Sequence, residues 1–306
     1  MPRTSFDALL EAGAHFGHLK RKWNPNIAPY VFGEKNGIHI IDLNKTLVKL
    51  EEAANAMKQI AKSGRTILFV ATKKQAKNIV SERIKEVGMP CITERWTGGM
   101  LTNFATIRRS VRKMSDMNKM ATDGTIEALS KKEKLQLSRQ RAKLEHQLGS
   151  IANMTRLPAA IFVVDITKEH IAISEAHKLN IPTFAIVDTN SDPNKVEFAI
   201  PANDDSSTSI RIVVDTLIQA IKEGLDERKD AQVSNKREDG KEEEVETEGV
   251  DSKYESAEGD EVLAEEEKKA KSHQGGAHHK GGQGHQGGPK RGPVGGSGNR
   301  RSPVKK

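Results

Sequence analysis

The chain has 306 residues, enough for one large domain or two smaller ones, and its apolar fraction of 35% is low for a wholly globular protein. All eight Phe lie at or before Phe198, and the only later aromatic residue is Tyr254. We therefore expect a folded domain over residues 1–225 and a disordered tail over 226–306. With Cys91 as the single cysteine, the sequence excludes an intramolecular disulfide and a multi-thiolate zinc site.

The net charge of +7 is unevenly distributed along the chain. Glu238–Glu267 holds two lysines and fifteen acids, a net charge of −13, whereas Ser272–Lys306 holds seven basic residues and no acids. Residues 1–237 carry a net charge of +10, of which Arg95–Arg156 supplies +8 from thirteen basic and five acidic residues. This concentration favours a polyanionic partner over a general effect on solubility. The N-terminal segment has no apolar signal region, so we expect a cytoplasmic protein with no membrane partner.

Apolar periodicity predicts strands that alternate with helices over most of residues 1–225. In chain order we expect a short helix ending at Gly13, strands at 30–32 and 38–41, a helix over 44–62 capped by Asn44, a strand at 66–71, a helix over 74–87 and a strand at 90–93. A strand at 159–165, a helix over 169–179, a strand at 182–187 and a helix over 207–222 follow. Short, continuously apolar strands between helices are typical of an α/β fold, with a doubly wound parallel sheet covered on both faces.

Residues 104–155 interrupt this alternation with two predicted helices, Thr106–Met120 and Lys131–Ile151, joined by a turn-rich stretch at 122–125. Their apolar positions follow the narrow two-in-seven pattern of a coiled coil. We therefore predict an antiparallel coiled-coil hairpin inserted into the domain and protruding from it. The positions of the pattern are Ile107, Val111 and Met114 in the first helix, and Leu137, Leu144, Leu148 and Ile151 in the second.

The segment Arg95–Met114 (RWTGGMLTNFATIRRSVRKM) is the strongest candidate for a chemical role. Guanidinium groups pair with phosphate in two-pronged fashion or stack on bases, and the Gly98-Gly99 pair permits close approach of the backbone to another surface. The alternative is a solvated helix face, with Trp96 packed at a domain junction. The candidate RNA-binding residues are Arg95, Trp96, Arg108, Arg109, Arg112 and Lys113.

A second candidate RNA contact is the loop from His18 to Asn24, in which three consecutive cations precede an indole. Such a loop suits a phosphate backbone and a stacked, unpaired base. The alternative is an ordinary surface loop in which Trp23 covers a sheet edge. The candidate residues are His18, Lys20, Arg21, Lys22, Trp23 and Asn24.

Lys73 and Lys74 lie where a strand meets a helix N-terminus, the usual ligand crevice of an open α/β sheet. Together with Asp165 and Asp188 they define an alternative function, a nucleotide- or metal-dependent enzyme. The chain lacks GxxxxGK[ST] and GxGxxG motifs, so this alternative has no phosphate-binding signature. We interpret both lysines as surface groups or phosphate contacts on RNA, and we expect no cofactor, no small-molecule substrate and no enzymatic activity.

The stretch 187–205 places several acids in loops at the carboxyl edge of the sheet. Asp188, Asp204 and Asp205 are candidate ligands for a hard cation. We favour turn and cap chemistry instead, with Asp192 before Pro193 and Asp205 capping the last helix. No metal site is therefore assigned.

Several of these stretches resemble, in order, the bacterial family of the second small-subunit ribosomal protein. The resemblance lies in GAHFGH at 13–18, WNP at 23–25, NGIHIIDLNKT at 36–46, FVATKKQA at 69–76, RWTGGMLTN at 95–103, and IPTFAIVDTNSDP through IPANDD at 181–205. It covers about residues 5–225. The family often has glycine where this chain has Ala71, and the acidic block and HQGG repeats of the tail depart from most members.

The resemblance implies a flavodoxin-like domain with a protruding coiled coil and a ribosome-bound, non-enzymatic role. Family members are expected to contact ribosomal RNA between the head and body of the small subunit, together with other small-subunit proteins. They also help to recruit ribosomal protein one, which binds messenger RNA. By the same resemblance, the Trp23 loop and Arg95–Lys113 face RNA. A metal has been suggested near the protein-one contact in some members, which keeps Asp188 and Asp204 as candidates.

Overall fold

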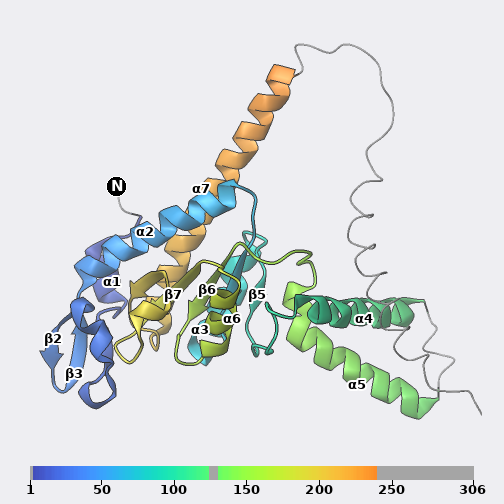
Figure 1. The fold of residues 1–306 in the computed structure, drawn as a ribbon, viewed down its shortest axis with the longest axis horizontal. Coiled ribbons are helices and arrows are strands. Elements are labelled where there is room, and N and C mark those ends of the chain that lie inside the picture. The colour runs from blue at the N-terminus through green and yellow to red at the C-terminus, as the bar shows by residue number, and fades with distance from the viewer. Residues whose placement is uncertain (1–2, 124–129, 240–306) are drawn as a thin grey trace, which may run out of the picture. The chain divides into compact units, whose positions relative to one another are not determined.

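The structure, a computed structural model, describes residues 3–123 and 130–239 (Figure 1). These residues belong to the first of two units into which the chain divides, Met1–Glu243 and Glu244–Lys306. The helices are α1 (Phe6–Glu11), α2 (Leu43–Lys62), α3 (Lys74–Lys85), α4 (Phe104–Thr122), α5 (Lys131–Leu148), α6 (His170–Lys178) and α7 (Ser207–Asp239). The strands are β1 (Phe16–Leu19), β2 (Val31–Lys35), β3 (Ile38–Ile41), β4 (Ile67–Val70), β5 (Cys91–Ile92), β6 (Ala160–Val164), β7 (Thr183–Val187) and β8 (Phe198–Pro201).

The larger sheet has five parallel strands in the order β5-β4-β6-β7-β8. Counted from β4, this is the order 2-1-3-4-5 of flavodoxin-like folds, with its switch point between β4 and β6. The predicted parallel α/β sheet is therefore confirmed. Strand β8 was not predicted, because Pro201 at its end reads as a loop signal; proline is tolerated there because β8 is an edge strand.

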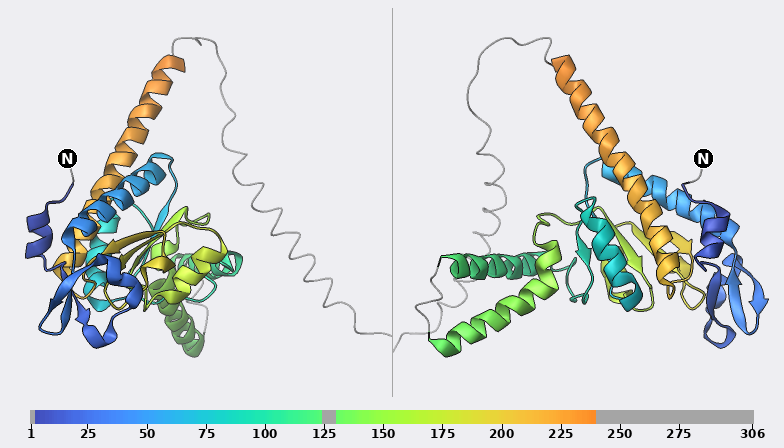
Figure 2. Two further views of the ribbon diagram at one scale, coloured as in Figure 1. Left: turned by 60° about the vertical axis from the view of Figure 1, so that its left-hand side comes forward. Right: turned by 180° about the vertical axis from the view of Figure 1, so that it is seen from behind.

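Helices cover both faces of this sheet, as its continuously apolar strands require. On one face, Phe69, Phe162 and Phe184 pack in a core with α2, α3 and α7. On the other face, Leu68 and Val163 pack with α6 and with the loop before α4. The start of α4 and the end of α5 belong to the same core. The ribbon views show α7 lying beside α2 over the first of these faces (Figures 1 and 2).

A second, antiparallel sheet, in the order β1-β3-β2, precedes the parallel one. Strand β3 matches the predicted 38–41, β2 overlaps the predicted 30–32 but continues to Lys35, and β1 was not predicted. Its register with β3 is interrupted by an irregularity between Phe16 and Leu19, which obscures the period-two pattern of a strand. The following helix α2 begins at Leu43, and its cap is Asp42 rather than the expected Asn44.

Helices α4 and α5 occupy the predicted interruption and contact each other. Ile107 and Leu148 lie in the core beneath the sheet, and Val111 and Leu144 pack against that core. Helix α5 begins with a capping box between Ser130 and Glu133 and gives way to a 3-10 turn at 149–151. The coiled-coil character of this pair stays a prediction, and residues 124–129 of the expected connection lie outside the described residues.

Helix α7 continues to Asp239, well beyond the predicted end at residue 222 and the predicted domain boundary at 225. That prediction is therefore wrong for residues 226–239. Leu225 packs against the core, and Glu227 forms ion pairs with Lys58 and Lys62 of α2. These contacts extend the helix where composition alone indicated disorder. The predicted disorder of the remaining tail concerns residues 240–306, which lie outside the described residues.

Across residues 3–123 and 130–239, every helix is too short or too polar to cross a membrane.

Gly224 allows α7 to approach α2 closely. A Cβ atom at this position would lie 2.4 Å from the carbonyl oxygen of Lys58. Gly224→Ala should therefore lower the free energy of unfolding by about 1–3 kcal/mol, since overpacking outweighs the roughly 1 kcal/mol gain in helix propensity. Urea denaturation measures the effect.

The matched control is Gly149→Ala, because a Cβ there would meet only Glu145 Cγ at an ordinary 3.7 Å. The control should be as stable as the wild type or up to about 1 kcal/mol more stable. If Gly224→Ala unfolds at the same urea concentration as this control, the close packing of α7 on α2 is incorrect.

Candidate nucleic-acid interface

The cationic loop after β1 is fixed in place by the turn that follows β7. The amide of His18 donates to Thr189 Oγ1 at 2.7 Å, and the amide of Asn24 donates to the carbonyl oxygen of Thr189 at 2.8 Å. A Cβ at Gly17 would lie 2.5 Å from Thr189 Cγ2, so glycine is needed for this approach. The buried Thr189 thus holds both ends of the loop, a role that sequence reasoning did not identify.

The loop presents its charges outward. Residues Lys20–Lys22 form a single 3-10 turn, and all three side chains are exposed. Lys20 is paired with Glu34 at 2.7 Å. Trp23 is 36% exposed and its ring centroid lies 4.9 Å from that of His39. One face of the indole is therefore supported by the protein, while part of the side chain is open to solvent.

The second candidate segment has a buried part and an exposed part. Trp96 is only 6% exposed, and its Nε1 donates to Glu175 Oε1 at 3.1 Å. The structure thus favours the packing alternative for Trp96 over a contact with RNA. Arg95, immediately before it, is exposed.

The cations of α4 follow directly in the chain. Arg109, Arg112 and Lys113 are exposed on the helix. Arg108 is half-buried, and its Nη1 donates to the carbonyl oxygen of Thr155 at 2.9 Å, which links the start of α4 to the chain beyond α5. Three cations within five residues therefore face solvent beside a fixed helix start.

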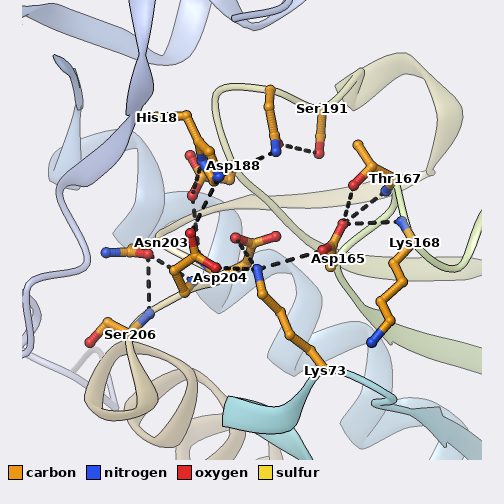
Figure 3. Close-up of polar contacts among 12 residues, drawn as sticks. His18, Lys73, Asp165, Thr167, Lys168, Asp188, Ser191, Asn203, Asp204 and Ser206 are labelled. Carbon is orange, nitrogen blue, oxygen red and sulfur yellow. Dashed lines mark hydrogen bonds and ion pairs between the residues drawn. The ribbon is translucent and has the colours of Figure 1, made fainter. Parts of the chain in front are cut away.

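Lys73 has a different environment from the surface cations. It is the N-cap residue of α3, after β4, and its Nζ lies 2.8 Å from Asp204 Oδ1 and 3.5 Å from Asp165 Oδ2 (Figure 3). The same Nζ lies 2.6 Å from Asp205 Oδ1. Burial lowers the pKa of Lys73, but hydrogen bonds to Asp204 and Asp205 outweigh it and raise the pKa overall. The ammonium is thus neutralised within the protein, so we do not include Lys73 among the residues proposed to contact RNA. Lys74, the first residue of α3, is exposed.

The acids around Lys73 come from the carboxyl ends of parallel strands, which meet at one edge of the sheet. His18 joins them: its Nδ1 lies 3.1 Å from Asp188 Oδ2 (Figure 3). Its Nε2 lies 3.3 Å from Asp205 Oδ2. The hydrogen bond to Asp188 raises the pKa of His18 despite partial burial. Burial, reinforced by the charge of Asp188, raises the pKa of Asp204 to about 7.

Among these predicted acids, Asp205 has a different role from the one expected. Asp205 was predicted to cap the last helix, yet it is Ser206 Oγ that accepts from the amide of Ser209 in the first turn of α7. The Asp205 carboxylate pairs with Lys73 instead, and this hydrogen bond lowers its pKa. The turn expected at Asp192 before Pro193 is confirmed, since its carboxylate accepts from the amide of Asn194.

The donor atoms of His18, Asp188 and Asp204 lie within 4.8 Å of one another. Asp204 Oδ2 is buried without a hydrogen-bond partner in the part of the chain that the structure describes. One imidazole nitrogen and two carboxylate oxygens fit a divalent cation such as Zn²⁺. Sequence reasoning named the two acids but not His18 as a third donor, because 170 residues separate it from Asp188 in the chain.

Comparison with known proteins identifies the family. Residues 9–224 match the model of the family described as "Ribosomal protein S2". The chain is 64% identical to small ribosomal subunit protein uS2 of Phocaeicola vulgatus, 63% to that of Bacteroides thetaiotaomicron and 64% to that of Porphyromonas gingivalis. Each alignment spans 229 residues, 75% of this chain and 82% of the relative. The chain therefore belongs to the ribosomal protein S2 family.

Proposed function

We propose that this protein is a structural component of the small ribosomal subunit and that it binds ribosomal RNA through two exposed basic segments. Family membership supports the structural role in translation and the prediction that the chain is not an enzyme. The alternative of a nucleotide- or metal-dependent enzyme is accordingly set aside. The RNA contacted lies, on this proposal, between the head and body of the subunit.

The RNA-binding part of the proposal is supported by one observation: the cations of two segments are exposed, whereas several acids are buried and paired within the protein. The exposed cations are those of the Lys20–Lys22 turn and of Arg109, Arg112 and Lys113 on α4. In contrast, Asp204 and Glu175 are buried and held by internal donors. Basic side chains that face solvent attract phosphates, and release of counterions then drives binding.

The proposed contact set consists of the predicted residues that are exposed, together with the half-buried Arg108 at the start of α4. The loop supplies phosphate contacts and a partly open indole at Trp23, and Asn24 lies at the end that Thr189 fixes. His18 is occupied by the acidic cluster, so it supports the loop rather than reaching RNA. The residues proposed to face RNA are Lys20, Arg21, Lys22, Trp23, Lys74, Arg95, Arg108, Arg109, Arg112 and Lys113.

We also place a protein contact on the small antiparallel sheet. Its two edge strands carry exposed apolar side chains, with Phe16 50% exposed on β1 and Phe32 80% exposed on β2. Large exposed aromatic side chains on edge strands mark a surface for a protein partner. In keeping with the resemblance, we assign this surface to ribosomal protein one, with other small-subunit proteins as neighbours.

Replacement of Arg109, Arg112 and Lys113 by Ala should weaken binding to a protein-free transcript of small-subunit ribosomal RNA. Each lost phosphate contact lowers the magnitude of the slope of log K against log salt by about 0.7–0.9, so three lower it by about two to three. Filter binding at KCl concentrations from about 50 to about 300 mM, with transfer RNA in excess as competitor, measures this slope.

The control removes three exposed cations of α7, Arg211, Lys222 and Lys229, with the same change in net charge. Its slope should remain close to that of the wild type. Equal losses in both variants would show a general charge effect and would remove α4 from the interface.

Phe32→Ser should reduce retention of ribosomal protein one on small subunits and leave RNA affinity unchanged, because the Phe32 side chain is apolar and carries no charge that could contact phosphate. Val48→Ser, an exposed apolar position on α2, is the control. Co-sedimentation with purified ribosomal protein one measures retention. Equal retention with both variants would contradict the assignment of this surface.

A further inference from the structure

Glu175 occupies the buried face of α6 and is 6% exposed. Its carboxylate accepts five hydrogen bonds, all from the loop 96–102 that leads into α4. Oε1 accepts from Trp96 Nε1 at 3.1 Å and from the Gly99 amide at 2.8 Å; Oε2 accepts from the Leu101 amide at 2.9 Å and from the amide and hydroxyl of Thr102, each at 3.2 Å.

A buried carboxylate is costly unless its oxygens are satisfied by hydrogen bonds. Burial alone would raise the pKa of Glu175, but the hydrogen bonds from Trp96, Leu101, Gly99 and Thr102 outweigh it and lower the pKa. The side chain is therefore an anion around which the loop closes. Convergent backbone amides of this kind form a ready binding site for an anion.

The position of the Glu175 carboxylate determines which groups of the loop are available to contact RNA. A glycine-containing loop beside a cluster of arginines would suit a phosphate group, but three of its amides already bind the Glu175 carboxylate. These three amides of the loop thus point toward Glu175. The side chains of the loop and the cations of the following helix are left to contact RNA.

Helix α4 begins directly after the loop that Glu175 holds. The Asn103 amide donates to the carbonyl oxygen of Gly99 at 2.8 Å, and Gly99 has a φ of +85° that favours glycine. Helix α4 starts at the next residue, Phe104, and its exposed cations follow within ten residues. Because the loop and the helix are continuous, the carboxylate that holds the loop also sets the origin of the cationic helix.

We propose that Glu175 is a positioning residue for RNA binding: it orders the loop 96–102 and thereby fixes Arg95 and the cations of α4 relative to the α/β body. This inference rests on the proposed RNA-binding function. A loop without this anchor adopts the arrangement that binds RNA for only a fraction of the time, and the observed affinity is reduced in proportion to that fraction.

The sign of the effect separates positioning from simple electrostatics. Removing a negative charge from a protein that binds RNA strengthens binding if only the overall field matters. Glu175→Gln removes that charge and also places an amide donor against the donors of the loop, so it should weaken binding. The matched control is Glu169→Gln, because Glu169 is equally buried at the start of α6 but accepts from Thr72 rather than from the loop.

We expect Glu175→Gln to bind the small-subunit ribosomal RNA transcript roughly ten-fold more weakly than the wild type, with the same salt slope because the cations are intact. Glu169→Gln should bind as tightly as the wild type or slightly more tightly. Hydrogen exchange should show lost protection at the amides of Gly99, Leu101 and Thr102, with unchanged protection in β4 and β6.

Wild-type affinity of Glu175→Gln, or an equal loss in both variants, would overturn this inference and leave the proposed function standing. Failure of the wild type itself to bind the transcript would overturn both. If Glu175→Gln does not fold, Thr102→Val decides, since it removes one donor from an exposed position. That variant should bind about two- to five-fold more weakly at unchanged thermal stability, and unchanged binding would overturn the inference.

Discussion

The fold depends on the neutralisation of Lys73 by three carboxylates at the carboxyl edge of the sheet. An open α/β sheet usually binds its ligand at this edge, near the switch point between β4 and β6. Here side chains from the ends of β4, β6 and β8 meet there, and His18 brings the N-terminal sheet against the same acids. The resulting network ties the two sheets together and occupies the usual ligand crevice with internal charges.

A similar arrangement of buried charge is found at the loop that leads into α4. Glu175 is an internal anion that binds backbone amides, just as the acids around Lys73 bind an internal cation. In both places a buried charged group is paired with groups of the protein itself, whereas the cations of the Lys20–Lys22 turn and of α4 are exposed. A basic surface on a rigid body is what a structural RNA-binding protein needs, because phosphate contacts give affinity and a fixed arrangement gives register.

Much of the fold could be predicted because the buried strands β4 and β6 are short, continuously apolar runs between helices. The missed elements have weaker local signals: β8 ends in Pro201, and β1 is irregularly paired. The length of α7 could not be inferred because ion pairs with α2, rather than composition, hold its later turns.

The candidate site was predictable in its exposed cations but not in its buried partners. A run such as Lys20–Lys22 is visible in any sequence, and the structure exposes it. The packing of Trp96 depends on Glu175, which lies 79 residues further along the chain. The hydrogen bond between His18 and Thr189 joins residues that are 171 positions apart in the chain. Such tertiary contacts have no local pattern, so neither supporting residue could be named in advance.

The central claim is that this protein is a structural, RNA-bound component of the small ribosomal subunit. Sucrose-gradient sedimentation of a cell extract at physiological salt, with detection of the full chain by antibody, tests this claim most directly. The account predicts that the protein sediments with small subunits and that high salt releases it. Recovery of the protein in the soluble fraction at physiological salt, with intact small subunits free of it, would contradict the account.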